Sequence, residues 1–193
     1  KFSLPADNES DIYTHLDLHW VPPELREDSG EIEASLAGKL PQLMEPSMLK
    51  GAFHNHTTAS DGTASLEQMA QAAQDLGWEF LGIADHSQIL QVASGLSPDE
   101  LISQSAEVRA LNESWADRGV DFRLFHGNEC DILPDGSLDY TDEERSILDH
   151  VVGSVHQLPT WMKRDEVENT EALIRAIEEP SFTILGHPTG RIL

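Results

Sequence analysis

The sequence predicts an α/β fold built around a parallel β-sheet. Segments with strand-like and helix-like patterns alternate between residues 48 and 193, and this alternation is typical of parallel sheets with right-handed crossovers. Each of the five predicted strands also ends on or beside a histidine, aspartate or glutamate. Sites in α/β proteins form outside the carboxyl ends of the strands. Open doubly wound sheets and closed barrels both satisfy this pattern.

Apolar patterning and capping residues define the individual elements. Strands are predicted at 49–56, 79–85, 120–129, 150–156 and 181–187. The helices between them are predicted at 65–77, 97–119, 141–149 and 164–179. Ser97 and Thr141 stand at positions that favour an N-cap, and Gly77 and Gly119 stand where a helix ends.

The N-terminal segment 1–47 differs from the rest and is interpreted as a connector arm that precedes one domain at 48–193. Prolines interrupt its polar stretches, and one short helix is expected within 27–40, where apolar residues recur at helical spacing. The chain begins at Lys1 and ends at Leu193 on a predicted strand without a covering helix. We therefore expect a piece of a longer protein, with further C-terminal elements.

Charge and composition restrict the class of partner. Thirty-five acidic residues face 12 basic residues, which gives a formal net charge of −23. Such a chain is not expected to bind a nucleic-acid backbone unaided, so a DNA substrate would need another, basic domain. No apolar run approaches the roughly 20 residues that span a bilayer, so a soluble protein without a membrane partner is expected. The single cysteine, Cys130, excludes an internal disulfide and favours a reducing, cytoplasmic setting.

Histidines and carboxylates at the strand ends predict a metal site. His54 and His56 are two residues apart on a predicted strand, which places both side chains on one face. An H-x-H pair alone is weak evidence, but every other strand adds a candidate. The predicted metal ligands are His54, His56, Asp61, His86, Glu129, His156 and His187. Imidazole and carboxylate ligands without thiolate suit zinc, manganese or iron, and this many ligands suggest more than one metal.

Several polar residues near these ligands also have structural interpretations. Asp61, in a Ser-Asp-Gly sequence, also fits a turn. Asp85 is expected either to orient His86 or a neighbour, or to cap the strand end. His126 lies inside a predicted strand and is expected to pack in the core. His150 begins a strand, at the wrong end for the site, and is expected to be structural.

Four further features are weaker candidates. The aspartates within 131–139 fit a turn better than a calcium loop, because the acidic spacing of a calcium-binding hand is absent. His15 and His19 lie in the arm and are expected at the surface or in packing contacts. Arg191 closely follows the last candidate ligand and can hold a phosphate oxygen. A surface pairing with one of the many acids explains this arginine equally well.

Five segments, taken in order, resemble the PHP (polymerase and histidinol phosphatase) domain: FHNHTTASDG, GIADHS, GNECDILPDGSLDY, GSVH and GHPTGR. The likeness is strongest to the PHP domain at the C-terminus of bacterial family X DNA polymerases. Residues 11–43 resemble the connector that precedes it there. The resemblance covers nearly the whole chain and implies an irregular (β/α)7 barrel, incomplete at the C-terminus of this chain.

The resemblance also implies a set of metals and their ligands. It implies up to three divalent metals, which are zinc or manganese in most members. The first would be held by His54, His56 and Glu129, and the second by Glu129, His156 and His187. The third would be held by Asp61 and His86. The first of these groups forms the catalytic centre. Two departures from the family pattern matter. Ala52 and Phe53 stand where the family usually has Asp-Leu, and an Asp-x-His motif is expected beyond Leu193. Without that motif the first and third sites each lack a ligand.

Three functions are consistent with this resemblance. The first is a metal-dependent phosphoesterase that hydrolyses phosphodiesters at DNA 3′ ends by metal-activated water, as a 3′–5′ exonuclease attached to a polymerase portion. The second is a small-molecule phosphatase of the histidinol phosphatase kind, which the acidic surface favours. The third is an inert structural domain that packs on a polymerase.

Overall fold

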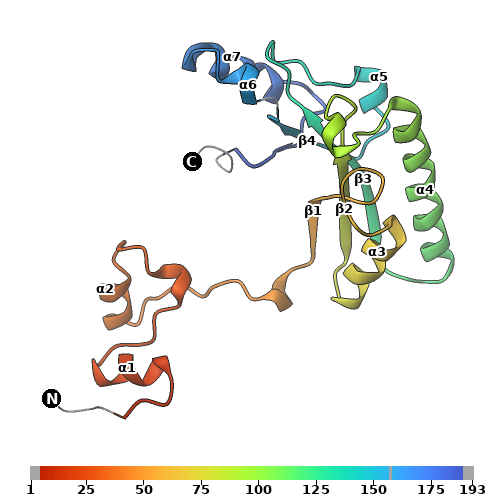
Figure 1. The fold of residues 1–193 in the computed structure, drawn as a ribbon. Helices are drawn as coiled ribbons and strands as arrows, with labels where there is room; N and C mark the ends of the chain where they lie inside the picture. The colour runs from red at the N-terminus through yellow and green to blue at the C-terminus, as the bar shows by residue number, and fades with distance from the viewer. Residues whose placement is uncertain (1–4, 157, 189–193) are drawn as a thin grey trace. The chain divides into compact units, whose positions relative to one another are not determined.

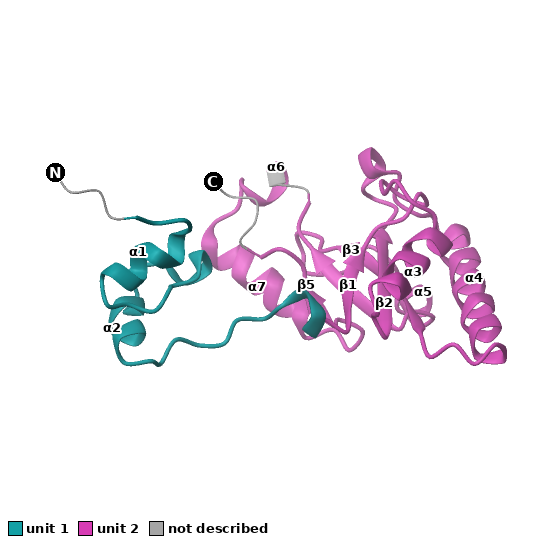
Figure 2. Ribbon diagram, turned by 90° about the horizontal axis from the view of Figure 1, so that it is seen from below, with its two compact units in different colours: residues 1–48 teal, residues 49–193 magenta. Residues whose placement is uncertain are grey.

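The computed structural model describes residues 5–156 and 158–188. It divides the chain into two compact units, Lys1–Met48 and Leu49–Leu193, which Figure 2 shows in different colours. Arg191 and the other residues after 188 lie outside the described part. No helix in the described part is both long and apolar enough to cross a membrane.

The first unit is a short helical segment held by polar contacts. Its helices are α1 (Glu9–His15) and α2 (Glu31–Leu36), with 3₁₀ turns at Pro23–Leu25 and Pro46–Met48. Arg26 and the indole nitrogen of Trp20 both donate to the carboxylate of Glu9, at 2.8 and 2.9 Å. The helix expected within 27–40 is α2, whereas α1 was not predicted, although Asn8 and Asp11 form a capping box at its start.

The second unit contains a five-stranded parallel sheet. Its strands are β1 (Gly51–Asn55), β2 (Phe80–His86), β3 (Arg123–Asp131), β4 (His150–Ser154) and β5 (Ile184–Leu185). They lie side by side in sequence order, β1-β2-β3-β4-β5. A doubly wound sheet reverses its strand order at the centre, whereas consecutive β/α units of a barrel keep one direction. The order therefore supports the barrel alternative, and the sheet is not closed within the described residues.

Helices cover one face of this sheet (Figure 1). They are α3 (Leu66–Asp75), α4 (Pro98–Asp117), α5 (Asp142–Arg145), α6 (Leu158–Trp161) and α7 (Glu166–Ile177). Four of them begin with a capping box, whose N-cap residues are Ser65, Ser97, Thr141 and Asp165. Each box satisfies backbone N–H groups that have no partner inside the helix.

Two apolar clusters hold the helices against the sheet. In the first, Leu81, Ile83 and Leu124 pack against residues of α3 and α4, including the buried Trp115. In the second, Val151 and neighbouring residues pack under α6 and α7. Alternate residues of each strand point to opposite faces. The face of the sheet away from these clusters is therefore free to present polar side chains.

The sheet is strongly curled. Strands β1 and β5 occupy its opposite edges, and in a flat sheet with a spacing of about 4.8 Å they would lie about 19 Å apart. His54 on β1 and His187 just after β5 nevertheless have ring centroids only 5.7 Å apart. The curl brings the two edges toward a common centre.

Candidate metal centre

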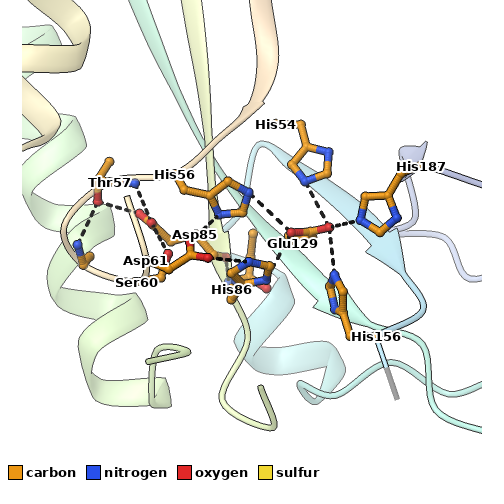
Figure 3. Close-up of polar contacts among 12 residues, drawn as sticks. His54, His56, Thr57, Ser60, Asp61, Asp85, His86, Glu129, His156 and His187 are labelled. Atoms are coloured by element: carbon orange, nitrogen blue, oxygen red, sulfur yellow. Dashed lines mark hydrogen bonds and ion pairs between the residues drawn. The ribbon is translucent and has the colours of Figure 1, made fainter. Parts of the chain in front are cut away.

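The carboxylate of Glu129 lies at the centre of the polar cluster, near the end of β3 (Figure 3). The residue is 1% exposed. Its Oε1 lies 3.0 Å from Nε2 of His54, 3.1 Å from Nε2 of His156 and 2.8 Å from Nε2 of His187. One carboxylate oxygen is therefore surrounded by imidazoles from β1, from the residues after β4 and from the residues after β5.

The other oxygen of Glu129 faces two more histidines. Oε2 lies 3.4 Å from Nε2 of His56 and 3.1 Å from Nδ1 of His86. These two rings stack with centroids 4.4 Å apart. On their far side lies Asp61, whose Oδ1 is 3.7 Å from Nδ1 of His56 and whose Oδ2 is 3.6 Å from Nε2 of His86. Each of the two imidazoles therefore lies between Glu129 and Asp61.

The local backbone that carries His54 is irregular. Strand pairing between β1 and β2 shifts between Ala52 and Asn55, and His54 has φ 68°. His54 and His56 both face Glu129, as expected, but not through a regular strand, because β1 ends at Asn55 and its end is distorted. His187 also has a positive φ, of 25°. Backbone strain of this kind concentrates at functional sites.

Burial and neighbouring charged groups shift the pKa values of residues in the cluster. Burial raises the pKa of Glu129, but the imidazoles of His156 and His54 beside it outweigh burial and hold the pKa well below its usual range. Burial lowers the pKa of His156, but hydrogen bonds to Asp131 and Glu129 raise it to about 9. For His86, burial dominates and lowers the pKa. Glu129 is therefore ionised, as a metal ligand must be.

Asp131 is a site residue that was not predicted. A turn is expected at residues 131–139, but β3 continues to Asp131, which is fully buried. Its Oδ2 accepts a hydrogen bond from Nδ1 of His156 at 3.0 Å. A carboxylate in this position fixes the orientation of a ligating imidazole and increases its basicity. The available signal was position, two residues after Glu129 on a strand, which places both side chains on one face.

Asp85 holds the loop that carries Asp61. It is fully buried and accepts from the backbone N–H of Thr57 at 2.7 Å, from Oγ1 of Thr57 at 2.7 Å and from Oγ of Ser60 at 2.6 Å. Nε2 of Gln104 donates to it at 2.6 Å. Asp85 therefore orients neighbouring residues, as expected, and these are residues 57–60. Within the described part of the chain, no hydrogen bond joins Asp85 to a histidine.

The remaining histidines of the second unit lie apart from the centre. His126 is 2% exposed, and its Nε2 lies 3.2 Å from Oε1 of Gln104. His150 is 4% exposed and packs edge-on against Phe53, with centroids 4.8 Å apart. Burial lowers the pKa of each to about 4. These contacts agree with the packing and structural roles expected for them. Burial also raises the pKa of Cys130, to about 11, so this thiol is not an active nucleophile.

The arm histidines make contacts within the first unit. His15 contacts the carbonyl of Pro5 through Nε2 at 2.8 Å, and His19 accepts through its backbone carbonyl from Ser35 at 2.8 Å. Arg191, the candidate phosphate-binding residue, lies outside the described residues.

The donor atoms fit a divalent metal cluster. Three sets have donor atoms that all lie within 4.8 Å of one another: His54, His56 and Glu129; His56, Asp61 and His86; and His86, Glu129 and His156. The first is the set expected for one metal. The other two overlap it and each other through His56, His86 and Glu129. The donors are nitrogen and oxygen without sulfur, which suits zinc, manganese or iron.

Comparisons with known proteins identify the family of this chain. Residues 52–192 match the PHP domain family. The chain is 37% identical over 186 residues to a Bacillus subtilis protein named DNA polymerase/3′-5′ exonuclease PolX, and this match covers 96% of the chain and 31% of that protein. It is 33% identical over 140 residues to a probable phosphatase of Clostridium botulinum, with 69% of the chain and 51% of the phosphatase covered. The chain thus spans about a third to a half of these relatives.

Among solved structures, the chain resembles one described as a putative histidinol phosphatase from Listeria monocytogenes. The TM-score is 0.47 with 19% identity, over 55% of this chain and 45% of that one. The family match covers most of the chain, including all seven predicted ligands between His54 and His187. This chain belongs to the PHP domain family.

Proposed function

We propose that this chain is the metal-dependent phosphoesterase module of a larger protein. The observation that carries the proposal is the arrangement around Glu129, where five imidazoles surround one buried, ionised carboxylate. This arrangement is poorly explained as a stability device, because a buried charge is stabilised no better than a well-packed apolar group. Clusters of groups with perturbed pKa values mark functional sites.

The residues of the centre have different roles in holding metal and substrate. When bound, divalent metals neutralise phosphoryl oxygens and lower the pKa of water so that it attacks at neutral pH. Glu129 supplies the negative charge common to the cluster. Asp131 holds His156 in orientation, and Asp85 fixes the loop that brings Asp61 to the outer edge. In hydrolysis, water adds to phosphorus, the bond from phosphorus to the leaving oxygen breaks, and that oxygen takes a proton.

We further propose that the substrate is a phosphodiester at a DNA 3′ end. The likeness to PolX supports a DNA substrate, because the match covers 96% of the chain. A match confined to the second unit, Leu49–Leu193, would cover a smaller share of the chain. The first unit is therefore included in the similarity. The net charge of −23 means that an attached basic portion must supply the contacts to the DNA backbone.

A small phosphate ester is the second candidate substrate. The relatives named probable phosphatases match 69–72% of this chain, and the acidic composition does not hinder a small substrate. Such a substrate needs no basic track along the protein surface. The two candidates therefore differ in the size of the substrate and not in the chemistry at phosphorus.

The test is hydrolysis by the full-length protein with manganese or zinc. A 5′-labelled single-stranded oligonucleotide is compared with p-nitrophenyl phosphate as a small ester. We expect shortening of the DNA from its 3′ end, and a loss of at least about 100-fold in rate for Glu129→Gln, since outer-shell changes alone cost 10–100-fold. Glu113→Gln, an exposed change on α4, is the matched control. A preference for the small ester would favour the second candidate, and no hydrolysis of either would leave a structural role.

A further inference from the structure

A cavity of about 320 Å³ adjoins the metal centre. His187 forms part of its wall, and Nε2 of the same residue lies 2.8 Å from Oε1 of Glu129. Val155, which precedes the candidate ligand His156, lines the cavity as well. His187 is therefore shared by the cavity and the cluster.

The wall of the cavity is mainly apolar. Its apolar lining residues include Val155, Met162, Leu173 and Leu185. Arg164 also lines it, but its guanidinium donates to the backbone carbonyls of Pro134 and Glu168 and is occupied there. A wall of this kind disfavours a second phosphate and favours an uncharged group with flat apolar faces.

Two polar atoms from wall residues need hydrogen-bond partners. Nε1 of Trp161 and Oδ1 of Asn169 are buried, and neither has a partner within the described part of the chain. The first is a donor and the second an acceptor. Both atoms are closed off from solvent, so a ligand in the cavity pairs with them only if these side chains turn toward it.

We propose that this cavity takes the nucleobase of the terminal nucleotide, whose phosphate is held at the Glu129 cluster. The inference rests on the proposed phosphoesterase function and specifies its substrate. A nucleobase has flat apolar faces and an edge with both donors and acceptors. Ligand pockets range from about 300 to 1,000 Å³, so a cavity at the low end holds one ring system and not a run of nucleotides.

The test compares two ligands that differ only in the base. Deoxyadenosine 5′-monophosphate and 2-deoxyribose 5-phosphate are titrated calorimetrically into the full-length protein with manganese. We expect the nucleotide to bind about tenfold more tightly, in line with the burial of one aromatic base. Met162→Asp places a charge on the wall at a side chain that is 79% exposed, so the fold is retained. We expect this variant to lose the tenfold preference while its affinity for the sugar phosphate stays the same.

Val92→Asp is the matched control, since Val92 is 91% exposed and does not line the cavity. It is expected to keep the tenfold preference. Equal affinity of the wild-type protein for both ligands would overturn the base-binding inference and leave the phosphoesterase proposal standing. Failure of both ligands to bind would count against the phosphoesterase proposal itself.

Discussion

Oδ2 of Asp131 lies 3.0 Å from Nδ1 of His156, and both side chains are 1% exposed. The opposite ring nitrogen of His156 contacts Glu129 at 3.1 Å. The imidazole is therefore held between two carboxylates, one of which belongs to the centre of the cluster while the other lies outside it.

Replacing Asp131 with asparagine should weaken metal binding without removing a ligand. Asparagine keeps the volume and loses the charge that makes His156 basic, so we expect a 10–100-fold lower affinity for zinc at an unchanged maximum stoichiometry. Competition with a chromophoric chelator measures this affinity. The matched control is Asp135→Asn, since Asp135 caps Ser137 in an exposed turn. Equal affinities of the two variants would contradict the role given to Asp131.

Replacing Asp85 with asparagine should destabilise the loop that carries Asp61. The carboxylate accepts from Thr57, Ser60 and Gln104, and an amide group would turn a donor toward donors. We expect the free energy of unfolding to fall by about 1–3 kcal/mol. Hydrogen exchange at the amide of Thr57 should accelerate as well. Ser60→Ala removes a single donor and should have a smaller effect on both the free energy of unfolding and the exchange rate. An equal effect of the two substitutions would contradict the role of Asp85 as the common acceptor for these donors.

Acid should destabilise the fold through buried neutral histidines. His150 has a folded pKa of about 4, below the usual value of 6.5 for histidine, so the unfolded chain takes up the proton first. Its contribution to stability is present above pH 6.5 and is lost as the pH falls toward 4. Linkage gives a loss of about 2 kcal/mol at pH 5 for this imidazole. His126 has the same shift, with the same sign.

The variant His150→Leu isolates this contribution. Neither ring nitrogen of His150 has a hydrogen-bond partner in the described part, so leucine removes no hydrogen bond. In chelator-treated protein, we expect the variant to match the wild type in free energy of unfolding near pH 7.5 and to exceed it by about 2 kcal/mol at pH 5. A constant difference across this range would contradict the shift. The raised pKa of His156 changes stability with pH in the opposite direction. This contribution is the same in both proteins, so it cancels in the difference between them.

The thiol of Cys130 should be unreactive in the folded protein. It is fully buried at the end of β3, and burial raises its pKa to about 11. We expect labelling by 5,5′-dithiobis(2-nitrobenzoic acid) only after addition of guanidinium chloride, with one thiol titrated per chain. Rapid labelling of the native protein would show that β3 opens, because no access exists in the folded state.

The sequence predicted the sheet well because its strands are buried on the helix-covered face. Apolar alternation located β2 and β3, and the helices beside them carry capping boxes that can be read directly, as at Ser97. Strand β5 is shorter than expected because only Ile184 and Leu185 pair with β4. The short helix α6 was missed because its sequence contains Pro159 and too few residues to show a period.

The candidate ligands were predicted from their positions at strand ends, but their mutual geometry was not. Periodicity gives the face of a residue and says nothing of the curl that brings His54 near His187. It also gave no indication of the irregular end of β1. Asp131 was missed because the residues after it, including Gly136, form a turn, and turn composition concealed the last residue of the strand.

The curl of the sheet also sets the order in which the centre is assembled. Glu129 and His54 are synthesised well before His187, which follows β5 near the end of this chain. Until the last strand docks, the carboxylate lacks one of the imidazoles that face its Oε1. The set of imidazoles around Oε1 is therefore complete only after β5 has been made and has docked.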